Sequence, residues 1–295
     1  MERTTWRASI QAYLYLLPAL VIIVLFTIYP IIKSLLISFY DDYDYFNDIV
    51  YARGFASYQY LWNDPTFHKA LWNTFVFVIG VVPASIALSM FIAVLLNSNI
   101  RLRSFFRTAY FIPFVTSVVA VSIVWRWIFH TEYGLFNYVL GLFGADPVAW
   151  LTDPKWAMPS LIILSIWKGL GYNIIIFLAG LQNINEQYNL AARMDGAGKA
   201  KRFFHITLPL LSPTTFFVSI VSIIGSFKVF DEIYALFGGQ PGPASSALTV
   251  VYYIFEKFYS EWEFGIASAA AYCLFIIIFI LTLIQLYIGK RKVTY

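Results

Sequence analysis

Charged residues are scarce in this chain. Of its 295 residues only 12% are Asp, Glu, Lys or Arg, whereas 60% are hydrophobic, and the mean hydropathy is +0.71. Soluble domains carry about 25% charged residues, so this sequence could not cover a water-facing surface in the usual way. The scarcity argues against an ordinary soluble domain and predicts a protein embedded in a membrane.

Cysteine and histidine are also scarce. The single cysteine, Cys273, lies in an apolar run, so no disulfide can form within the chain and the thiol is expected to serve packing. The three histidines, His68, His130 and His205, lie far apart, and the sequence predicts no metal site. The net charge of +4 comes largely from cations in short loops, which indicates membrane orientation and not nucleic-acid binding.

Catalytic and phosphate-binding motifs are absent from the sequence. No Gly-x-x-x-x-Gly-Lys-Ser/Thr segment is present, so this chain is not expected to bind ATP, and no cofactor is expected on it. Paired acids, a histidine cluster and a Gly-x-Ser-x-Gly elbow are likewise missing, which argues against an enzyme. A secondary transporter stays open as an alternative, although the related halves typical of that class are not visible.

Six apolar segments, each about 20 residues long, could cross a membrane. They lie near Tyr13–Ile32, Phe75–Leu96, Tyr110–Ile128, Ser160–Leu181, Leu208–Phe227 and Gly265–Ile288. The first is too long for the apolar core of a signal peptide, and no small-x-small cleavage site follows it. The sequence therefore predicts an all-α integral membrane protein with six transmembrane helices in one domain, residues 1–295.

The distribution of Lys and Arg predicts the orientation of these segments. Twelve of the 20 basic residues lie at the two ends of the chain or in the loops that follow the second and fourth segments. By the positive-inside rule both termini are cytoplasmic, in a multi-pass protein of the inner (cytoplasmic) membrane. The outer loops, 41–69, 131–158 and 238–262, are rich in aromatic residues. These fit membrane-interface belts or a docking face for an extracytoplasmic partner.

Residues 183–209, between the fourth and fifth segments, differ from the rest of the chain. Glu186 to Met194 are good helix formers, which Asn185 can cap and Asp195-Gly196 can end. A second amphipathic piece, with phenylalanines on one side and basic residues on the other, leads from Gly198 to Pro209. The sequence predicts two short helices on the cytoplasmic surface, lying in anionic lipid or docked on a protein.

This loop carries a pattern that resembles a known family. The matching residues are Ala191, Ala192, Asp195, Gly196, Ala197, Ile206, Leu208 and Pro209. In the cytoplasmic loop of ABC importer permeases, Glu-Ala-Ala is followed after two residues by Asp-Gly-Ala, and further on by Ile-x-Leu-Pro. Leu190 stands where that family usually has Glu, and Glu186, one helical turn earlier, could serve in its place. Tyr29-Pro30, Asn73-Thr74 and Phe230-Asp231 extend the resemblance to the sugar-uptake branch over nearly the whole chain.

The resemblance implies an assembly and a role for the loop. The expected partners are a second, homologous permease, two ATPases that bind ATP and Mg²⁺, and an extracytoplasmic solute-binding protein that delivers a sugar or oligosaccharide. The short helix would dock on an ATPase through Glu186, Leu190, Ala191, Ala192, Asp195, Gly196, Ala197 and Pro209. The chain would be a transport component without catalytic activity of its own. A permease for a non-sugar solute remains the main alternative.

Polar residues within the fourth and fifth segments indicate where solute could pass. Buried charge in a membrane is costly, so such side chains tend to face the bundle interior or a cavity. The residues expected to meet sugar are Tyr172, Asn173, Lys228, Asp231 and Tyr234. The alternative is purely structural: an interhelical pair, Lys168–Asp231 or Lys228–Glu232, that locks the bundle. Gly169 and Gly171 are expected to loosen the helix beside these groups.

Overall fold

The computed structural model describes residues 6–98, 101 and 103–292. They fall into two compact units, one formed by residues 1–64 and 254–273 and the other by residues 65–253 and 274–295. In chain order the α-helices and strands are α1 (Trp6–Ile23), α2 (Tyr29–Ile37), β1 (Tyr40–Asp44), β2 (Ile49–Arg53), α3 (Ala56–Asn63), α4 (Pro65–Asn97), α5 (Arg103–Val115), α6 (Val118–Ile128), α7 (Leu135–Leu142), α8 (Pro154–Gln182), α9 (Glu186–Met194), α10 (Lys199–Arg202), α11 (Leu208–Leu210), α12 (Ser212–Phe227), α13 (Asp231–Leu236), α14 (Val250–Phe255) and α15 (Phe264–Lys292).

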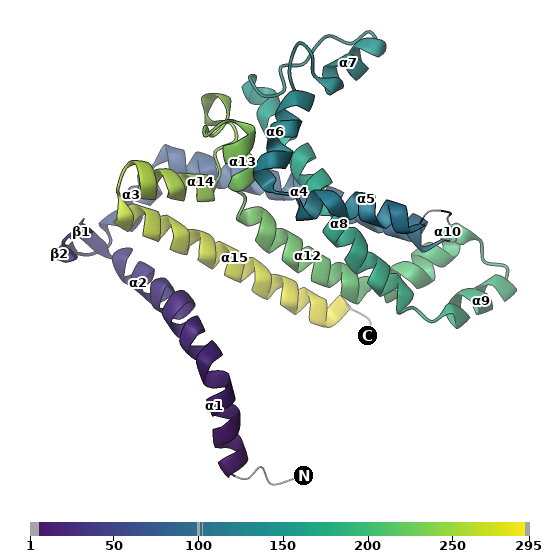
Figure 1. The fold of residues 1–295 in the computed structure, drawn as a ribbon, viewed down its shortest axis with the longest axis horizontal. Coiled ribbons are helices and arrows are strands. Elements are labelled where there is room, and N and C mark those ends of the chain that lie inside the picture. The colour runs from purple at the N-terminus through teal and green to yellow at the C-terminus, as the bar shows by residue number, and fades with distance from the viewer. Residues whose placement is uncertain (1–5, 99–100, 102, 293–295) are drawn as a thin grey trace. The chain divides into compact units, whose positions relative to one another are not determined.

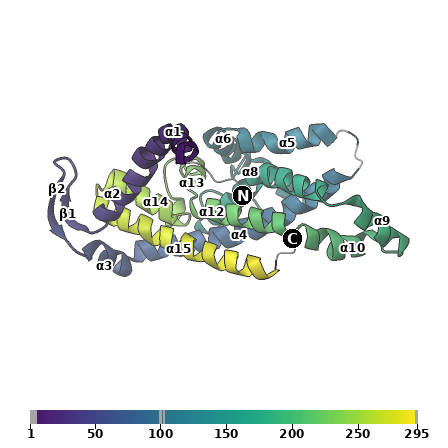
Figure 2. The same ribbon diagram turned by 90° about the horizontal axis from the view of Figure 1, so that it is seen from below.

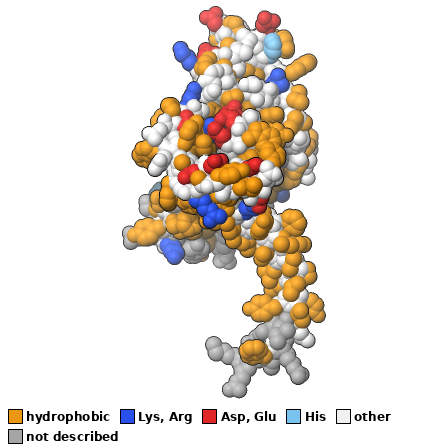
Figure 3. Space-filling model, turned by 90° about the vertical axis from the view of Figure 1, so that its left-hand side faces the viewer, with side chains coloured by type: hydrophobic (Ala, Val, Ile, Leu, Met, Phe, Trp, Pro, Cys, Tyr) orange, Lys and Arg blue, Asp and Glu red, His pale blue; other side chains and the backbone are white. Residues whose placement is uncertain are grey.

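The first unit joins a long apolar helix to a small hairpin. A π-helical turn, Val24–Ile28, connects α1 to α2, and hydrophobic side chains cover these helices (Figure 3). Strands β1 and β2 pair antiparallel. The Asp44 carboxylate closes their turn by accepting from the Phe46 and Asn47 amides at 3.0 and 3.1 Å. These hydrogen bonds, with that from the Asn47 side chain first, hold the pKa of Asp44 below its usual value.

Lys257 anchors the end of this unit that precedes α15. It is buried, and its ammonium donates to Glu261 and Glu263 at 2.6 and 2.7 Å and to the Tyr60 hydroxyl at 3.3 Å. Burial alone would lower the pKa of Lys257, but these hydrogen bonds raise it above its ordinary range. The lysine therefore stays charged and ties the segment before α15 to α3.

The second unit is a helix bundle centred on α4 and α8. Helices α4 and α8 pack along their length, α5 lies on α8, and α12 lies on α4 (Figure 1). Asp153 caps α8 by accepting from the Lys155 amide at 2.9 Å, and Pro154 occupies the first helical turn. At the end of α8 that leads to α9, the buried core consists of Met90, Ala93, Leu96, Ile174, Phe177, Leu178, Leu181, Leu211 and Val218.

Gly171 allows the backbones of α5 and α8 to touch. A Cβ added at Gly171 would lie 2.1 Å from the carbonyl oxygen of Tyr110, so no larger residue fits without displacing α5. At Gly169 the nearest atom to such a Cβ is the Ser85 hydroxyl, at 3.9 Å. Helix α8 runs unbroken through both glycines. The expectation that they loosen the helix is therefore wrong, and Gly171 serves close packing instead.

The apolar segments form membrane-length helices, with two bends. Four helices are long and apolar enough to cross a membrane: Tyr13–Ile37, Pro65–Asn97, Pro154–Gln182 and Phe264–Lys290. Two further pairs reach that length only if each is one broken span, Ser104–Val115 with Val118–Ile128 at 103°, and Lys199–Leu210 with Ser212–Phe227 at 64°. The described residues thus contain four to six candidate spans.

The third apolar segment, predicted near Tyr110–Ile128, is bent. Helix α5 contains Pro113, and both the amide and the hydroxyl of Thr116 donate to the Ile112 carbonyl, at 3.1 and 2.7 Å. Ser117 then takes an extended ψ of 132° and starts α6. Helix α5 ends at this point, and the chain turns into α6 (Figure 1).

Candidate functional site

A cavity of about 580 Å³ opens in the second unit where α4, α5, α6, α8, α12 and α13 meet. Its polar and charged lining residues are Ser85, Ser165, Lys168, Tyr172, Asn173, Ser222, Ser226, Lys228, Asp231 and Glu232. The remaining lining is apolar or glycine, including Phe77, Phe114 and Val118. A largely apolar cavity that carries several polar and charged groups, between membrane-length helices, has the size and composition of a small-molecule site.

Four of the five residues expected to meet solute line this cavity. Tyr172 and Asn173 come from α8, Lys228 ends α12, and Asp231 begins α13. Tyr234 is not among the described residues that line it. Its ring lies 5.6 Å from that of Phe230, measured between ring centroids, and it contacts the turn at Gly239. These four positions are up to 59 residues apart in the chain, and the cavity brings them together.

Tyr172 and Asn173 are held by neighbouring helices. The Asn173 side chain is 5% exposed, and its amide donates to the Ser85 hydroxyl of α4 at 3.0 Å. The Tyr172 ring stacks on Phe114 of α5 at 5.0 Å between ring centroids. These contacts fix both side chains in place, so they face the cavity from a rigid wall.

The ion pair in this region joins Lys168 to Glu232. The ammonium and carboxylate are 3.3 Å apart, and both side chains are largely buried. Neither of the two pairs considered from the sequence, Lys168–Asp231 or Lys228–Glu232, is formed. The side chains of Lys228 and Asp231 line the cavity and form no hydrogen bond or ion pair with any residue in the described part of the chain. One cation and one anion therefore remain available to a solute.

The serines of the cavity were not singled out from the sequence. Ser222 and Ser226 are four residues apart on α12, so they share one helix face. Ser165 of α8 lies one turn before Gly169, on the face that also carries Tyr172. Small hydroxyl residues recurring every three or four positions within apolar segments were the signal that could have identified this face.

The loop between α8 and α12 has the expected capped helix. The Asn185 side chain caps α9 by accepting from the Gln187 amide at 3.0 Å. Gly196 ends the helix with φ +75°. The Gly196 amide donates to the Arg193 carbonyl at 3.1 Å, and the Ala197 amide to the Ala192 carbonyl at 2.8 Å. This pair of bonds is a Schellman motif, which requires a residue with positive φ.

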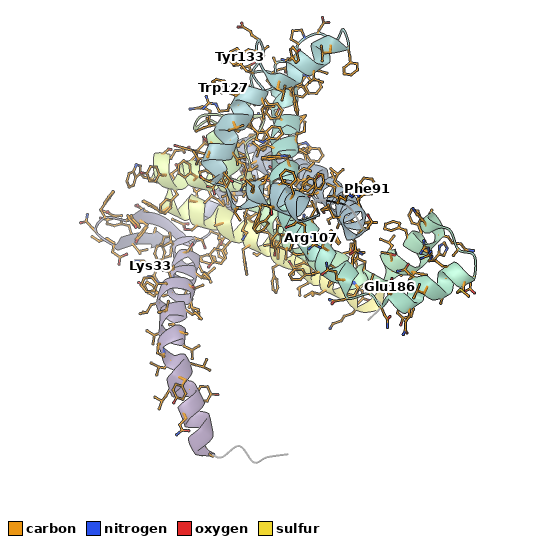
Figure 4. All side chains as sticks on the ribbon, turned by 45° about the vertical axis from the view of Figure 1, so that its right-hand side comes forward. Lys33, Phe91, Arg107, Trp127, Tyr133 and Glu186 are labelled. Atoms are coloured by element: carbon orange, nitrogen blue, oxygen red, sulfur yellow. The ribbon has the colours of Figure 1, made fainter. Side chains whose placement is uncertain are left out.

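Much of the surface of α9 contacts nothing else in the described chain. Leu190 is 49% exposed and Met194 89% exposed, and Ala191 and Asp195 are also exposed. Glu186 and Leu190, one turn apart, both line a polar cavity of about 640 Å³. Figure 4 labels Glu186 on α9. Pro209 lies in α11, after the π-helical turn Phe203–Thr207. Helices α9 and α10 form a hairpin beyond the end of α8 (Figure 2).

Comparison with known proteins identifies related chains. A family profile described as "Binding-protein-dependent transport system inner membrane component" matches residues 85–294. The chain is 36% identical to the lactose transport system permease protein LacF of Rhizobium radiobacter, over 98% of this chain and 99% of LacF. It is 36% identical to the arabinooligosaccharides transport system permease protein AraP of Bacillus subtilis, over 93% of this chain and 87% of AraP.

A solved structure shares the fold. It is of a bacterial alginate ABC transporter in complex with an alginate pentasaccharide-bound periplasmic protein. One of its chains superposes with a TM-score of 0.84 at 24% identity, over 98% of both chains.

Proposed function

Because this chain belongs to the family of binding-protein-dependent transport system inner membrane components, we propose that it is the permease of an ABC importer for a sugar or oligosaccharide. An extracytoplasmic solute-binding protein delivers the solute. Two partner ATPases, which bind ATP and Mg²⁺, drive alternating access of this chain and a second permease. The chain is one multi-pass domain of the inner membrane, residues 1–295, and catalyses no reaction itself.

The cavity lined by Tyr172, Asn173, Lys228 and Asp231 is the observation that carries the sugar assignment. Sugar rings offer hydroxyl groups at their edges and apolar C–H faces. The cavity supplies hydrogen-bonding groups together with the aromatic pair of Tyr172 and Phe114. Relatives named for lactose and arabinooligosaccharides support the same class of solute.

Helix α9 is proposed as the element that couples the spans to an ATPase. Its exposed Leu190 and Met194 would be unfavourable in water, so this surface fits burial against another molecule. The small side chains of Ala191 and Ala192 permit close approach to a groove on the ATPase. Asp195, Gly196 and Ala197 form the turn that ends the helix. Glu186 and Leu190 face the same cavity, so Glu186 lies where it could replace the family glutamate.

The topology has a direct test. In a variant with Cys273→Ser, single cysteines at Asn47 or Ala145 should be labelled from outside intact cells by a membrane-impermeant maleimide. A cysteine at Ala200 should be labelled only after the membrane is opened. All three native side chains are exposed, so the label has access. The reverse pattern would contradict six spans with cytoplasmic termini.

Transport is tested in proteoliposomes that contain the whole assembly. Saccharide-stimulated ATP hydrolysis and ATP-dependent uptake are expected, with lactose and arabinooligosaccharides as first probes. Stimulation by amino acids or peptides, and by no saccharide, would identify a permease for a non-sugar solute. Uptake driven by an ion gradient without ATP would identify a secondary transporter.

A further inference from the structure

The cavity is lined by equal numbers of positive and negative charges. Its charged lining residues in the described chain are Lys168, Lys228, Asp231 and Glu232, so two cations face two anions. The Lys168 ammonium is already committed to Glu232 at 3.3 Å. Lys228 and Asp231, three residues apart, are the cation and anion left to meet a solute. The part of the cavity wall that this chain contributes has no net positive or negative charge.

A charged solute would need a surplus of the opposite charge. Lys168 is near the middle of α8, a candidate span of 29 residues, and Lys228 follows directly after the candidate span that ends at Phe227, so the cavity extends from the middle of one candidate span to the end of another. An ion moved to that depth loses hydration and must find an opposite charge that is not already neutralised. A carboxylate or sulfonate in this cavity would be attracted by Lys228 and repelled by Asp231. It would gain no net compensation for its lost water.

An uncharged polyol, in contrast, can bind through both free charged groups and through the hydroxyl groups of the cavity. The Asp231 carboxylate accepts from hydroxyl groups, the Lys228 ammonium donates to them, and serine and tyrosine hydroxyls do both. The Ser165 hydroxyl is buried without a hydrogen-bond partner in the described chain, so it too has capacity for a solute hydroxyl. Two further serines that line the cavity, Ser222 and Ser226, lie on one face of α12.

We infer that the solute crossing this cavity is an uncharged saccharide, and that Asp231 and the Lys168–Glu232 pair select against acidic sugars. The inference rests on the proposed sugar-import function and narrows its substrate class. Each free charge is expected to shift the preference between neutral and acidic sugars in one direction. Removing the free anion should favour acidic sugars, whereas removing the free cation should favour neutral ones.

The test measures saccharide binding to the assembled transporter in nanodiscs, without the solute-binding protein, by saturation-transfer NMR. The probes are two matched pairs, α-1,4-galactobiose with α-1,4-digalacturonate, and cellobiose with cellobiouronic acid. Within each pair the compounds differ in oxidation at C6. The wild-type assembly should bind the neutral member of at least one pair about tenfold more tightly, because the acidic member loses hydration without net compensation from the balanced charges of the cavity.

Variants then test which side chains distinguish the acidic probes from the neutral ones. Asp231→Asn should lower the neutral-to-acidic preference about tenfold, and Lys228→Gln should raise it by a similar factor. Asp146→Asn and Lys155→Gln, on exposed side chains outside the cavity, are the matched controls and should leave the preference unchanged. A purely structural role for Asp231 would weaken both members of a pair equally and leave their ratio unaltered.

Three results would overturn the inference. These are equal or tighter binding of the acidic probes by the wild-type assembly, unchanged ratios in both cavity variants, and binding of no probe at all. The proposed function is judged separately, by saccharide-stimulated ATP hydrolysis with the binding protein present. An importer of acidic sugars would show saccharide-stimulated ATP hydrolysis but would not bind the neutral probes more tightly.

Discussion

Replacing Gly196 by valine isolates the turn that ends α9. Gly196 has φ +75°, and no atom lies within 4 Å of the Cβ that a substitution would add. The cost is therefore in the backbone, because an L-residue in the left-handed region is destabilised by roughly 1–2 kcal/mol, and a β-branched residue lies at the upper end. Helix α9 has nine residues, too few to be stable without its caps.

The same substitution at Gly198 is a matched control. Gly198 also has no atom within 4 Å of an added Cβ, but its φ of −66° and ψ of 167° suit any residue. Gly196→Val should raise the exchange rate of the Ala197 amide, which donates to the Ala192 carbonyl, by a factor of roughly 5–30. Gly198→Val should leave that rate nearly unchanged, and Gly196→Asn should restore most of the protection because Asn tolerates positive φ.

The functional consequence is measured on the assembled transporter. Gly196→Val should reduce co-purification of the ATPases or saccharide-stimulated hydrolysis, with the permease still folded in the membrane. Ala192→Trp should act in the same direction by holding α9 away from its partner. If both variants keep normal association and normal stimulated hydrolysis, α9 does not couple the ATPase and lies instead on the lipid surface.

Three further changes test the packing, the cavity and the hairpin. Gly171→Ala should destabilise the protein by about 1–3 kcal/mol in thermal unfolding, because its Cβ would collide with α5, whereas Gly169→Ala should be tolerated. Asn173→Ala should lower uptake about two- to tenfold while the assembly still forms, the effect of losing a hydrogen bond worth about 0.5–1.5 kcal/mol; parental uptake would exclude it from the solute path. The folded pKa of Asp44 is lowered, so its contribution to the hairpin is present above its ordinary value of 3.8 and is lost as the pH falls below it. Amide exchange in the β1–β2 turn from pH 6 to 3 measures that loss, and pH-independent protection would contradict it.

The sequence predicted best what depends on local composition. Long apolar runs became α4, α8 and α15, and Asn185 and Gly196 cap α9 as expected, because both signals act within one or two helical turns. The family resemblance, based on Ala191 to Pro209, is confirmed by the matches to the family profile and to permease relatives. The role of this loop in coupling remains a prediction.

The features that the sequence did not predict depend on contacts between distant segments. The pattern of an apolar segment with Pro113 and Thr116 does not distinguish a straight helix from a bent one. Only the packing of α6 on α13 shows where the chain turns. Gly171 looked like a weak point because a glycine lowers helix propensity. Its actual role is set by the carbonyl of Tyr110, 61 residues earlier, which no local pattern shows.

The choice of ion pair is the clearest case of this limit. Lys168 on α8 could reach either acid at the start of α13, since Asp231 and Glu232 are adjacent. On a helix adjacent residues point about 100° apart, so the orientation of α13 decides which one meets the lysine. The structure turns Glu232 toward Lys168 and leaves Asp231 facing the cavity beside Lys228. The partner of Lys168 thereby determines which acid remains free, and that acid is the one proposed to exclude acidic solutes.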